Sequence, residues 1–451
     1  MKIIVIDDDP TGSQTVNDCP LLLHSGKENI IQGLRYESKL LFLLANTRSM
    51  SPKLAEERIR QICRDLNEVL NDENLPEEDI IFVSRGDSTL RGHAVLEPTV
   101  INDELGPFDA TIHAPAFFEG GRTTVNGVHL LNGLPVHMTS FASDSIFGYS
   151  TSHLDMWLEE KSGGKISSKD VLRITTDLLD QALISSYGFN KLCNFLLTLS
   201  GNISVIVDAT SSNQLEVLGK AVRSLSGKKR FLFRSAASLI NGLANIKPNN
   251  CPARNLVSLR LRRETTEMKP GLIMVGSHVP LSDEQLEVLL REPSCVGIEL
   301  PVEKFLHLLQ GGFSASSLSN LKQHLLEELD NLLSSRKTPV LFTTRRELKF
   351  ESVEERINFG NQLAEFMASL VAKLSHELGY IISKGGITTH YLLEKGLNLS
   401  SVHLKGQLLP GLSIVCAANY MAAKNLPILT FPGNLGSKET LLEAWRLMEH
   451  K

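Results

Sequence analysis

Short apolar segments recur along the chain and alternate with longer stretches in which leucine, isoleucine and alanine recur at helical spacing. The apolar segments are rich in β-branched residues, and they read KIIVI, KLLFLLA, DIIFVS, ATIHA, ISVIVDA, FLF, GLIMV, PVLFTT, YIIS and LPILT. Strands that are apolar on both faces and are separated by helices are typical of parallel sheets covered on both sides. The pattern therefore predicts an α/β fold with largely parallel sheets.

The chain is also too long for one ordinary core. Its 451 residues predict two or three domains, at roughly 100–200 residues each. The segment from Asn245 to Lys269 lacks periodicity, and it combines prolines with the charged string RLRRETTEMKP. We expect a first domain over residues 1–250, a linker over 251–269 and a second domain over 270–451. No internal repeat is visible, so we expect two non-identical three-layer α/β/α domains.

Composition excludes several classes of protein and names no function. The chain is 42% hydrophobic and 22% charged, like an average soluble globular protein, and its net charge of −5 disfavours nucleic acid as the main partner. The six cysteines form no C-x-x-C pair, so neither a zinc site nor a disulfide framework is indicated. The N-terminal apolar run meets Asp7 after a few residues, and no stretch of about 18 apolar residues follows. We therefore expect a cytoplasmic protein with no membrane segment.

The first predicted strand ends in three consecutive carboxylates, within the segment VIDDDPTGSQT. Asp7, Asp8 and Asp9 are followed by a turn that contains Thr11 and Gly12. In open α/β sheets, ligands bind at the carboxyl ends of strands, so these side chains are placed to meet one. Such carboxylates can hold a sugar hydroxyl, deprotonate it or bind Mg²⁺. The structural alternative is that one of them only caps the following helix.

A phosphatase is the rival interpretation of the same segment. Asp7, Asp9 and Thr11 fit the D-x-D-x-T opening of haloacid dehalogenase-like phosphatases, in which the first aspartate becomes phosphorylated. That chemistry also needs a later lysine and a second acidic pair at a strand end. After ISVIV the chain offers only Asp208, which weakens this alternative.

A second polar cluster follows the predicted strand from Asp79 to Val83, in FVSRGDSTLRGH. Arginine forks bind a carboxylate or phosphate at two points, and neighbouring hydroxyls and an aspartate suit a polyol. The cluster is therefore a candidate cradle for an acid sugar, although a solvated turn with a surface ion pair is the plainer alternative. Its members are Arg85, Asp87, Ser88, Thr89 and Arg91.

A third segment, IHAPAFFEGGRTTVNGVHLL, joins paired glycines to Arg122, which can supply another anion contact. His113 and His129 lie in the same segment. Neither histidine has a partner at metal-ligand spacing, so we expect both to be hydrogen-bonded structural residues.

The second half of the chain repeats a plan of strand, glycine loop and helix. Backbone amides at such helix starts bind phosphates, although none of these loops is the Walker pattern. Gly276 precedes Ser277 in LIMVGSHVPLSDEQ, where a nucleotide phosphate or ribose would lie. The other two loops, YIISKGGITTH and LPILTFPGNLGSKET, contribute Gly385, Gly386, Gly433 and Asn434.

Taken together, these motifs resemble the four-carbon acid sugar kinases over nearly the whole chain. The resemblance rests on D-D-x-T-G from Asp8 to Gly12, D-S-T-L-R-G from Asp87 to Gly92, G-R-T-T-V-N-G from Gly121 to Gly127, and the C-terminal glycine loops. It implies a first domain that binds the acid sugar, a second that binds ATP with Mg²⁺, and an active site in the cleft between them. Members phosphorylate threonate, erythronate or 3-oxo-tetronate isomers. Homodimerisation is left open.

The resemblance also implies roles for particular residues. Substrate contacts are implied for Asp8, Asp9, Thr11, Asp87, Ser88, Thr89 and Arg91, and nucleotide contacts for Ser277, Gly385, Gly386, Ile387, Thr388 and Gly433. Within this scheme we expect Asp8 or Asp9 to act as base or metal carrier. We expect the carboxylate of the sugar acid to be held by Arg85, Arg91 and Arg122.

The chain departs from the family pattern at its nucleotide loops. Ile387 stands where the family has an acidic residue, and Phe431, Pro432 and Leu435 stand in a loop that usually reads K-S-G-N/G-F-G. A third aspartate and a proline also enlarge the first motif. A binding or regulatory protein descended from the kinases is therefore a further alternative.

Overall fold

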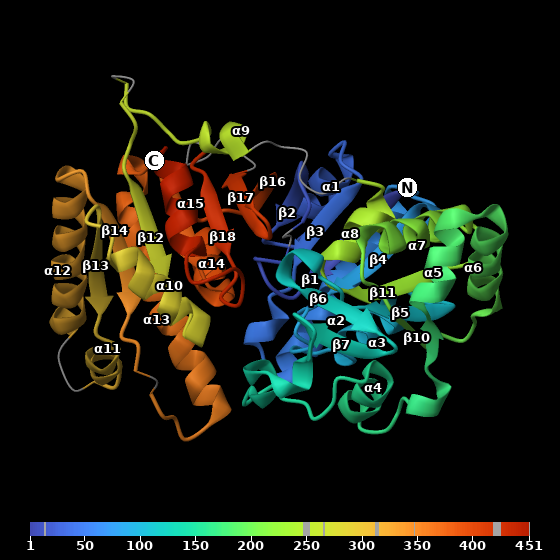
Figure 1. Cartoon of the computed structure of the whole chain (residues 1–451). Coiled ribbons are helices and arrows are strands. Elements are labelled where there is room, and N and C mark those ends of the chain that lie inside the picture. The colour runs from blue at the N-terminus through green and yellow to red at the C-terminus, as the bar shows by residue number, and fades with distance from the viewer. Residues whose placement is uncertain are drawn as a thin grey trace. The chain divides into compact units, whose positions relative to one another are not determined.

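The computed structural model describes residues 1–12, 15–246, 253–264, 267–311, 315–346, 348–417 and 425–450. The chain forms two compact units, Met1–Asn250 and Cys251–Lys451, and Figure 1 labels their helices and strands. Each unit combines a largely parallel sheet with helices on its faces, and the two sheets differ in strand order. The predicted fold class of non-identical α/β domains is confirmed.

The sheet of the first unit is parallel throughout its described strands. Its order is β2-β3-β1-β4-β11-β5-β10-β9. The bounds are β1 Lys2–Asp7, β2 Cys19–Leu22, β3 Leu40–Leu44, β4 Ile80–Arg85, β5 Ala110–Ala114, β9 Leu172–Ile174, β10 Ile203–Val207 and β11 Phe231–Ser235. A small antiparallel sheet is formed by β6 Arg122–Val125, β7 Val128–Leu131 and β8 Leu134–Pro135.

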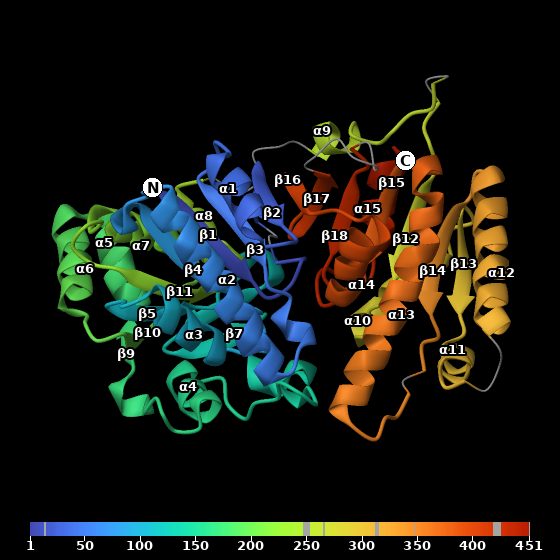
Figure 2. The same cartoon turned by 180° about the vertical axis from the view of Figure 1, so that it is seen from behind.

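Helices cover both faces of this sheet, as Figures 1 and 2 show from opposite sides. They are α1 Lys27–Arg35, α2 Pro52–Asp72, α3 Leu96–Leu105, α4 Leu154–Ser162, α5 Thr176–Ile184, α6 Ser186–Thr198, α7 Ser212–Ser224 and α8 Ala237–Ala244. The Ser51 side chain caps the start of α2, and Pro52 is the first residue of that helix.

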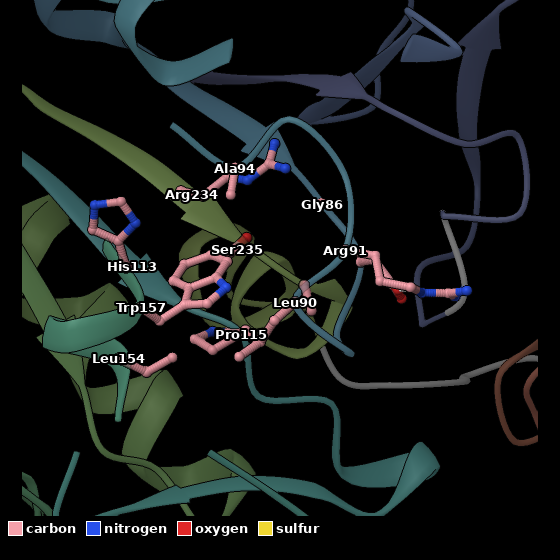
Figure 3. A pocket seen from close by; sticks show the side chains of 12 residues that line it. Gly86, Leu90, Arg91, Ala94, His113, Pro115, Leu154, Trp157, Arg234 and Ser235 are labelled. Carbon is pink, nitrogen blue, oxygen red and sulfur yellow. Dashed lines mark hydrogen bonds and ion pairs between the residues drawn. The ribbon is translucent and has the colours of Figure 1, made fainter. Parts of the chain in front are cut away.

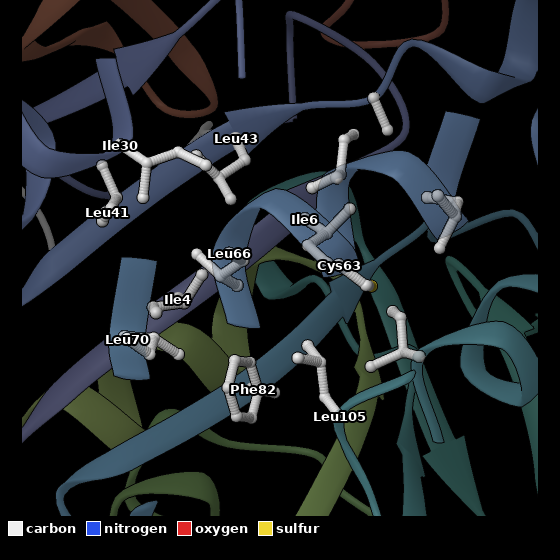
Figure 4. Close-up of a cluster of buried hydrophobic side chains, with 14 of the residues drawn as sticks. Ile4, Ile6, Ile30, Leu41, Leu43, Cys63, Leu66, Leu70, Phe82 and Leu105 are labelled. Atoms are coloured by element: carbon white, nitrogen blue, oxygen red, sulfur yellow. The ribbon is translucent and has the colours of Figure 1, made fainter. Parts of the chain in front are cut away.

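A core of aliphatic side chains joins α1, α2 and α3 to one face of the sheet (Figure 4). Ile4 and Ile6 of β1 point into it, whereas Ile3 and Val5 are equally buried on the opposite face. Alternate residues of a strand face opposite sides of a sheet, so β1 is apolar on both. This double burial explains why its sequence reads as a continuous apolar run.

The second unit has a mixed sheet in the order β13-β14-β12-β15-β18-β17-β16. Among the described strands, neighbours from β13 to β18 are parallel. β17 is antiparallel to β18, and β16 is antiparallel to β17. Their bounds are β12 Gly271–Val275, β13 Cys295–Leu300, β14 Thr338–Thr343, β15 Tyr380–Lys384, β16 Ser401–Leu409, β17 Leu412–Ala417 and β18 Ile428–Phe431.

The helices of the second unit follow the same alternating plan along the chain. They are α9 Ala253–Val257, α10 Pro280–Leu290, α11 Val302–Leu309, α12 Ala315–Ser334, α13 Val353–Leu374, α14 Gly386–Tyr391 and α15 Thr440–Glu449. The expected linker, 251–269, contains α9, and four of its residues lie outside the described part of the chain. Across the described residues, every helix is too short or too polar to span a bilayer.

Glycines allow α7 and α8 to pack with their backbones in contact, which gives a test of the fold. A Cβ on Gly219 would lie 2.1 Å from the carbonyl oxygen of Gly242, so alanine cannot fit without moving a helix. We expect Gly219→Ala to lower the free energy of unfolding by roughly 2–4 kcal/mol, measured by urea denaturation.

Gly360→Ala is the matched control. Gly360 lies within α13, where an added Cβ would meet nothing within 4 Å. Alanine there should raise stability by up to about 1 kcal/mol, because it favours the helix. Equal stability changes in the two variants would contradict the close packing of α7 on α8.

Candidate functional site

The register of the first sheet brings the ends of β1, β4 and β11 into one row. Asp7 pairs with Arg85, and Arg85 in turn pairs with Ser235. These strands are parallel, so the residues after each strand emerge at the same edge. Arg85 itself is the last residue of β4, because the strand runs two residues beyond the predicted end at Val83. The first and second sequence motifs therefore meet at this edge.

Buried carboxylates and arginines interlock at this edge. Arg48 binds Asp8 through two nitrogens, with Nη2 at 2.6 Å from Oδ1 and Nε at 3.2 Å from Oδ2, and its Nη1 lies 3.2 Å from Asp9 Oδ2. Arg85 Nη1 lies 3.2 Å from Asp8 Oδ1 and 3.4 Å from Asp7 Oδ1. The Thr11 hydroxyl and amide both donate to Asp9 Oδ1. Each aspartate is thus held in place by its neighbours.

Gly12 closes the turn against Asp7. A Cβ on Gly12 would lie 2.1 Å from Asp7 Oδ1, so no larger residue fits beside this carboxylate. Ser13 and Gln14 of the same motif lie outside the described residues.

Two carboxylates of the turn differ in their affinity for protons. Burial raises the pKa of Asp7 to about 7, against an opposing effect from the positive charge of Arg85. Burial would also raise the pKa of Asp9, but Arg48 and the hydrogen bonds from Thr11 outweigh it and lower this pKa below its ordinary value. Asp9 is therefore ionised at neutral pH, whereas Asp7 binds its proton more tightly than an ordinary carboxyl.

The second motif folds into a tight turn around Asp87. Thr89 Oγ1 donates to Asp87 Oδ2, and Arg91 Nε lies 2.7 Å from the same oxygen. Burial opposes ionisation of Asp87, but Arg91, Arg48 and Thr89 outweigh it and hold its pKa well below the usual range. Arg91 Nη1 also lies 3.7 Å from Asp144 Oδ2. Because Arg48 acts electrostatically on both Asp9 and Asp87, the two motifs form one site.

The backbone of this turn is fixed from the third motif. The Ser88 carbonyl oxygen lies 2.8 Å from His129 Nε2, and the Thr89 carbonyl accepts from the Tyr149 hydroxyl at 2.7 Å. Burial lowers the pKa of His129 to about 4, and Thr124 Oγ1 lies 2.9 Å from its other nitrogen. The structure thus gives His129 the hydrogen-bonded role expected from the sequence.

His113 and Arg122 complete the third motif. His113 is buried, but neither of its ring nitrogens has a hydrogen-bond partner among the described residues, so the expectation of a hydrogen-bonded residue is wrong for it. Arg122 is close enough to Asp87 and Arg91 to interact with their charges, and burial lowers its pKa to about 10. Its Nη1 donates to the Gly120 carbonyl.

Three charged residues of this site were missed from the sequence. They are Arg48, Glu97 of α3 and Arg234 of β11. The guanidinium of Arg234 contacts Glu97 Oε2 and lies 2.7 Å from Ser84 Oγ. Glu97 Oε1 also accepts from the Thr47 hydroxyl at 2.6 Å. Arg48 follows a predicted strand, which was a usable signal. Arg234 directly follows the predicted strand FLF and offered a signal of the same kind, whereas Glu97 follows no predicted strand and offered none.

The glycine loops of the second unit also meet at one sheet edge. Val275 pairs with Lys384, and Lys384 pairs with Phe431, so Ser277, Gly385 and Gly433 follow the ends of adjacent strands. A Cβ on Gly433 would lie 2.3 Å from Ser277 Oγ, and one on Gly385 would lie 3.2 Å from the Ser277 amide nitrogen. The loops therefore pack backbone against backbone, as close approach to a ligand requires.

The other predicted nucleotide residues lie at the same place. Gly386 begins α14, and the Thr388 hydroxyl packs against Gly276, where a Cβ would lie 2.1 Å from Thr388 Oγ1. Ile387 is exposed, and Asn434 is half-buried after β18. Within the described residues, no cluster of three or more His, Cys, Asp or Glu side chains is arranged to hold a metal ion.

Lys384 is an unpredicted charge between these loops. It is fully buried, its Nζ lies 3.2 Å from the Pro432 carbonyl oxygen, and the same atom lies 3.8 Å from the centre of the Phe431 ring. Burial, together with the charge of Arg345, lowers the pKa of Lys384 well below its ordinary value. A bound anion would therefore favour the protonated form of Lys384. In the segment YIISKGG, the paired glycines indicated a loop. No sequence pattern distinguished the lysine before them.

Both halves of the chain are similar to known protein domains. Residues 3–243 match a sugar-binding N-terminal domain, and residues 272–441 match a nucleotide-binding C-terminal domain. Together these matches cover most of the sequence. A D-erythronate kinase from Heliobacterium modesticaldum is 22% identical over 97% of this chain and 95% of its own length. The chain belongs to the four-carbon acid sugar kinase family.

Other relatives of this acid sugar kinase family member agree in length and fold. A D-threonate kinase from Salmonella typhimurium is 22% identical over 100% of the chain and 99% of its own length. A solved Salmonella typhimurium structure has a TM-score of 0.67 at 16% identity and covers 99% of both chains. A Haemophilus influenzae structure has a TM-score of 0.59 at 18% identity, with 99% and 100% coverage. At these identities the structures show the shared fold alone.

The raised pKa of Asp7 makes the stability of this family member depend on pH. A carboxyl whose pKa is about 7 when folded and about 4 when unfolded binds its proton more tightly in the folded state. Its contribution to stability is therefore complete below about pH 4 and is lost as the pH rises toward 7. We expect Asp7→Asn to become more stable relative to the native protein by roughly 2–3 kcal/mol between pH 5 and pH 7.

Urea denaturation at several pH values, followed by circular dichroism, measures this difference. Asp177→Asn serves as the control, because Asp177 lies at the exposed start of α5. Parallel stability curves for Asp7→Asn and the native protein would show that Asp7 has an ordinary pKa.

Proposed function

We propose that the protein is an ATP-dependent kinase that transfers a phosphoryl group to a hydroxyl of a four-carbon acid sugar. In this proposal the first unit, 1–250, binds the acid sugar and the second unit, from residue 270, binds ATP with Mg²⁺. The interlocked carboxylates and arginines at the ends of β1 and β4 carry the proposal. They provide hydrogen-bond acceptors for hydroxyls and arginine forks for a carboxylate within one site.

In the proposed acid sugar site, buried charged residues position their neighbours and partly exposed ones contact the substrate. The side chain of Asp8 is fully buried and holds Arg48 and Arg85, whereas Asp9 is 11% exposed. We assign Asp9 to the reacting hydroxyl and Asp8 to positioning the arginines. Arg48 and Arg91 reach solvent with 21% and 16% of their side chains exposed, so they are the anchors for the substrate carboxylate.

The remaining residues of the two motifs support these contacts. Arg85 is buried against Asp7 and Asp8 and positions them, while Arg122 adds positive charge beside Asp87. Thr11 orients Asp9, and Thr89 orients Asp87. Ser88 belongs to the same turn, where its backbone is fixed by His129. Such a site is ordered before the substrate arrives, which reduces the cost of binding.

The nucleotide side of the proposal rests on the packed loops of the second unit. Amides of the glycine loops at Gly386 and Gly433 would cradle phosphates, with Ser277 and Thr388 at the same edge. The Gly385 amide itself donates to the Phe431 carbonyl oxygen at 2.9 Å and so fixes the loop. The family lysine is absent from the loop after β18, but the Lys384 ammonium lies over Phe431, beside that loop. We infer that Lys384 supplies the missing positive charge from the neighbouring strand.

Catalysis in such an enzyme depends on positioning and on charge neutralisation. Phosphoryl transfer passes through a loose transition state, so the protein mainly aligns the reactants and stabilises the oxygens. Mg²⁺, which arrives with ATP, neutralises charge on the phosphates. Asp9 is ionised, and so it can orient the attacking hydroxyl and accept its proton as the new bond forms.

The geometry favours this kinase over a phosphatase. A phosphorylated Asp7 would need an exposed carboxylate, but Asp7 is fully buried, and its Oδ1 accepts from the Asp9 amide at 3.2 Å and faces Arg85. The backbone of Gly12 also packs against this carboxylate. A carboxylate held in this way is poorly placed to act as the nucleophile.

The first test measures ADP release from Mg-ATP with a panel of threonate and erythronate stereoisomers. We expect activity with at least one acid, and Asp9→Asn should lower kcat by about 10²–10⁴-fold because the hydroxyl loses its proton acceptor. Asp177→Asn, on the exposed start of α5, is the control and should retain kcat.

Asp7→Asn separates the kinase from the phosphatase, and a measurement of ATP binding separates it from a non-catalytic binding protein. The kinase should keep its activity within about tenfold in this variant, since Asp7 does not touch the substrate. Phosphate release from sugar phosphates without ATP, abolished by Asp7→Asn, would establish the phosphatase. Binding of an acid sugar without any binding of ATP would instead establish a non-catalytic descendant of the kinases.

The second test concerns the charge of Lys384. Its pKa is lowered in the free protein, so binding of ATP phosphates should raise this pKa and draw a proton from the solvent. Calorimetry in buffers of different ionisation enthalpy measures that uptake. We expect Lys384→Met to abolish the uptake and to weaken ATP binding by about 10–100-fold.

Lys337→Met is the matched control, because Lys337 Nζ also lies 3.0 Å from a proline carbonyl, that of Pro293, but outside the glycine loops. It should bind ATP as the native protein does. Unchanged ATP affinity in Lys384→Met would show that Lys384 only ties the two loops together.

A further inference from the structure

Each unit contains buried polar side chains to which the proposed reaction gives no role. In the first unit, a cavity under the turn of the second motif is lined in part by His113 and Ser235 (Figure 3). It has room for about one water molecule and is too small for a sugar or a nucleotide. In the second unit, Ser282 and Gln285 of α10 are fully buried, and their hydrogen bonds lead to the glycine loops. These two side chains therefore bear on the nucleotide site.

Ser282 joins two loops of the second unit. Its hydroxyl lies 2.9 Å from Ser277 Oγ and 3.1 Å from the carbonyl oxygen of Gly433. A hydroxyl has one proton to donate and a carbonyl can only accept, so Ser282 donates to Gly433 while it accepts from Ser277. When Ser277 donates to another group, Ser282 can donate to Ser277 instead. Ser277 is only half-buried, so its hydroxyl is held in place and can still give its proton to a phosphate oxygen.

Gln285 lies three residues after Ser282, on the same face of α10. Its Nε2 lies 3.1 Å from the carbonyl oxygen of Leu435 and 2.6 Å from that of Ser437, so both amide hydrogens have acceptors. The opposite orientation of the side-chain amide would place Oε1 against these two carbonyl oxygens, and the contacts thus determine its orientation. Together the two side chains of α10 contact three carbonyl oxygens of the loop after β18.

These contacts fix the nucleotide loops without using their amides. All three backbone atoms that α10 holds are carbonyl oxygens, whereas phosphates are bound by amide hydrogens. On the neighbouring loop, the Arg345 guanidinium contacts the carbonyl oxygen of Ser277. The backbone of Ser277 therefore stays held when Ser282 is changed, and such a change acts mainly on the Ser277 hydroxyl.

We propose that Ser282 and Gln285 are positioning residues of the nucleotide site, which hold the Ser277 hydroxyl and the loop after β18 in the arrangement that binds the phosphates of ATP. The inference rests on the proposed function and adds the residues that order the loops before ATP arrives. A loop that is already ordered loses less entropy on binding, so the affinity for ATP falls when these contacts are removed. The acid sugar binds to the other unit in this proposal, and its affinity should not change.

Calorimetry with Mg-ATP on the full-length protein tests the positioning role. Ser282→Ala removes the hydroxyl, and Gln285→Met removes the amide from a side chain of similar length. We expect each variant to raise the Kd of ATP by about 5–20-fold. In the ADP-release assay, the KM of ATP should rise by a similar factor, whereas the KM of the acid sugar should stay within about twofold of the native value.

Ser282→Thr tests rescue, because threonine keeps the hydroxyl, and it should bind ATP within about threefold of the native protein. Thr338→Val is the matched control for the loss of a buried hydrogen bond. Thr338 is the first residue of β14, at the opposite end of the strand from the loops, and its Oγ1 accepts from Trp445 Nε1 at 3.0 Å. This variant should lower the midpoint of urea denaturation without changing the Kd of ATP.

The outcomes distinguish the positioning role from the kinase activity. ADP release by the native protein, with native ATP affinity in both Ser282→Ala and Gln285→Met, would overturn the positioning role and leave the kinase intact. An equal loss of ATP affinity in Thr338→Val would also overturn it, because general destabilisation would then explain the effect. Weaker ATP binding in the α10 variants alone, without any ADP release, would support the positioning role and refute the kinase. A native protein that does not bind ATP would overturn both.

Discussion

The burial of carboxylates at the carboxyl edge of the first sheet is the constraint on which the site depends. Asp7, Asp8 and Glu97 are almost completely buried, and an unpaired carboxylate there would be very costly. Arginines from distant segments offset this cost: Arg48 on Asp8, and Arg234 on Glu97. Because each contact joins segments far apart in sequence, the charges fix how the strand ends lie relative to one another.

The loops of the second unit depend on close packing. Its loops approach so closely that a Cβ on Gly276 or Gly433 would collide with Thr388 or Ser277. Such close packing would let an anion approach the backbone of the loop cluster. Lys384 adds a buried side chain to this cluster, and burial disfavours its positive charge. An anionic ligand would stabilise that charge and the amides together.

The two units thus suit ligands of different character. In the first, the charges are already paired, so a ligand with a carboxylate and several hydroxyls exchanges partners with a preorganised network. In the second, closely packed glycine loops lie beside the buried Lys384 side chain, a combination that would suit phosphate oxygens. This division is the chemistry that a kinase of acid sugars requires.

The sequence by itself determined the α/β class and the placement of both sets of motifs at strand ends. These are local properties: a strand buried on both faces reads as an apolar run, and parallel strands release their last residues at one edge. Local pattern also misjudged some elements. The strand that ends at Arg85 is longer than predicted, and the strand Ser401–Leu409 was missed because Lys405 and a bulge at Gly406 interrupt it. Only the tertiary structure decided the partners, namely Arg48 on Asp8, Arg234 on Glu97, and Lys384 beside the loop after β18. Such pairings depend on strand order and register, which arise from contacts between distant segments and leave no local trace in the sequence.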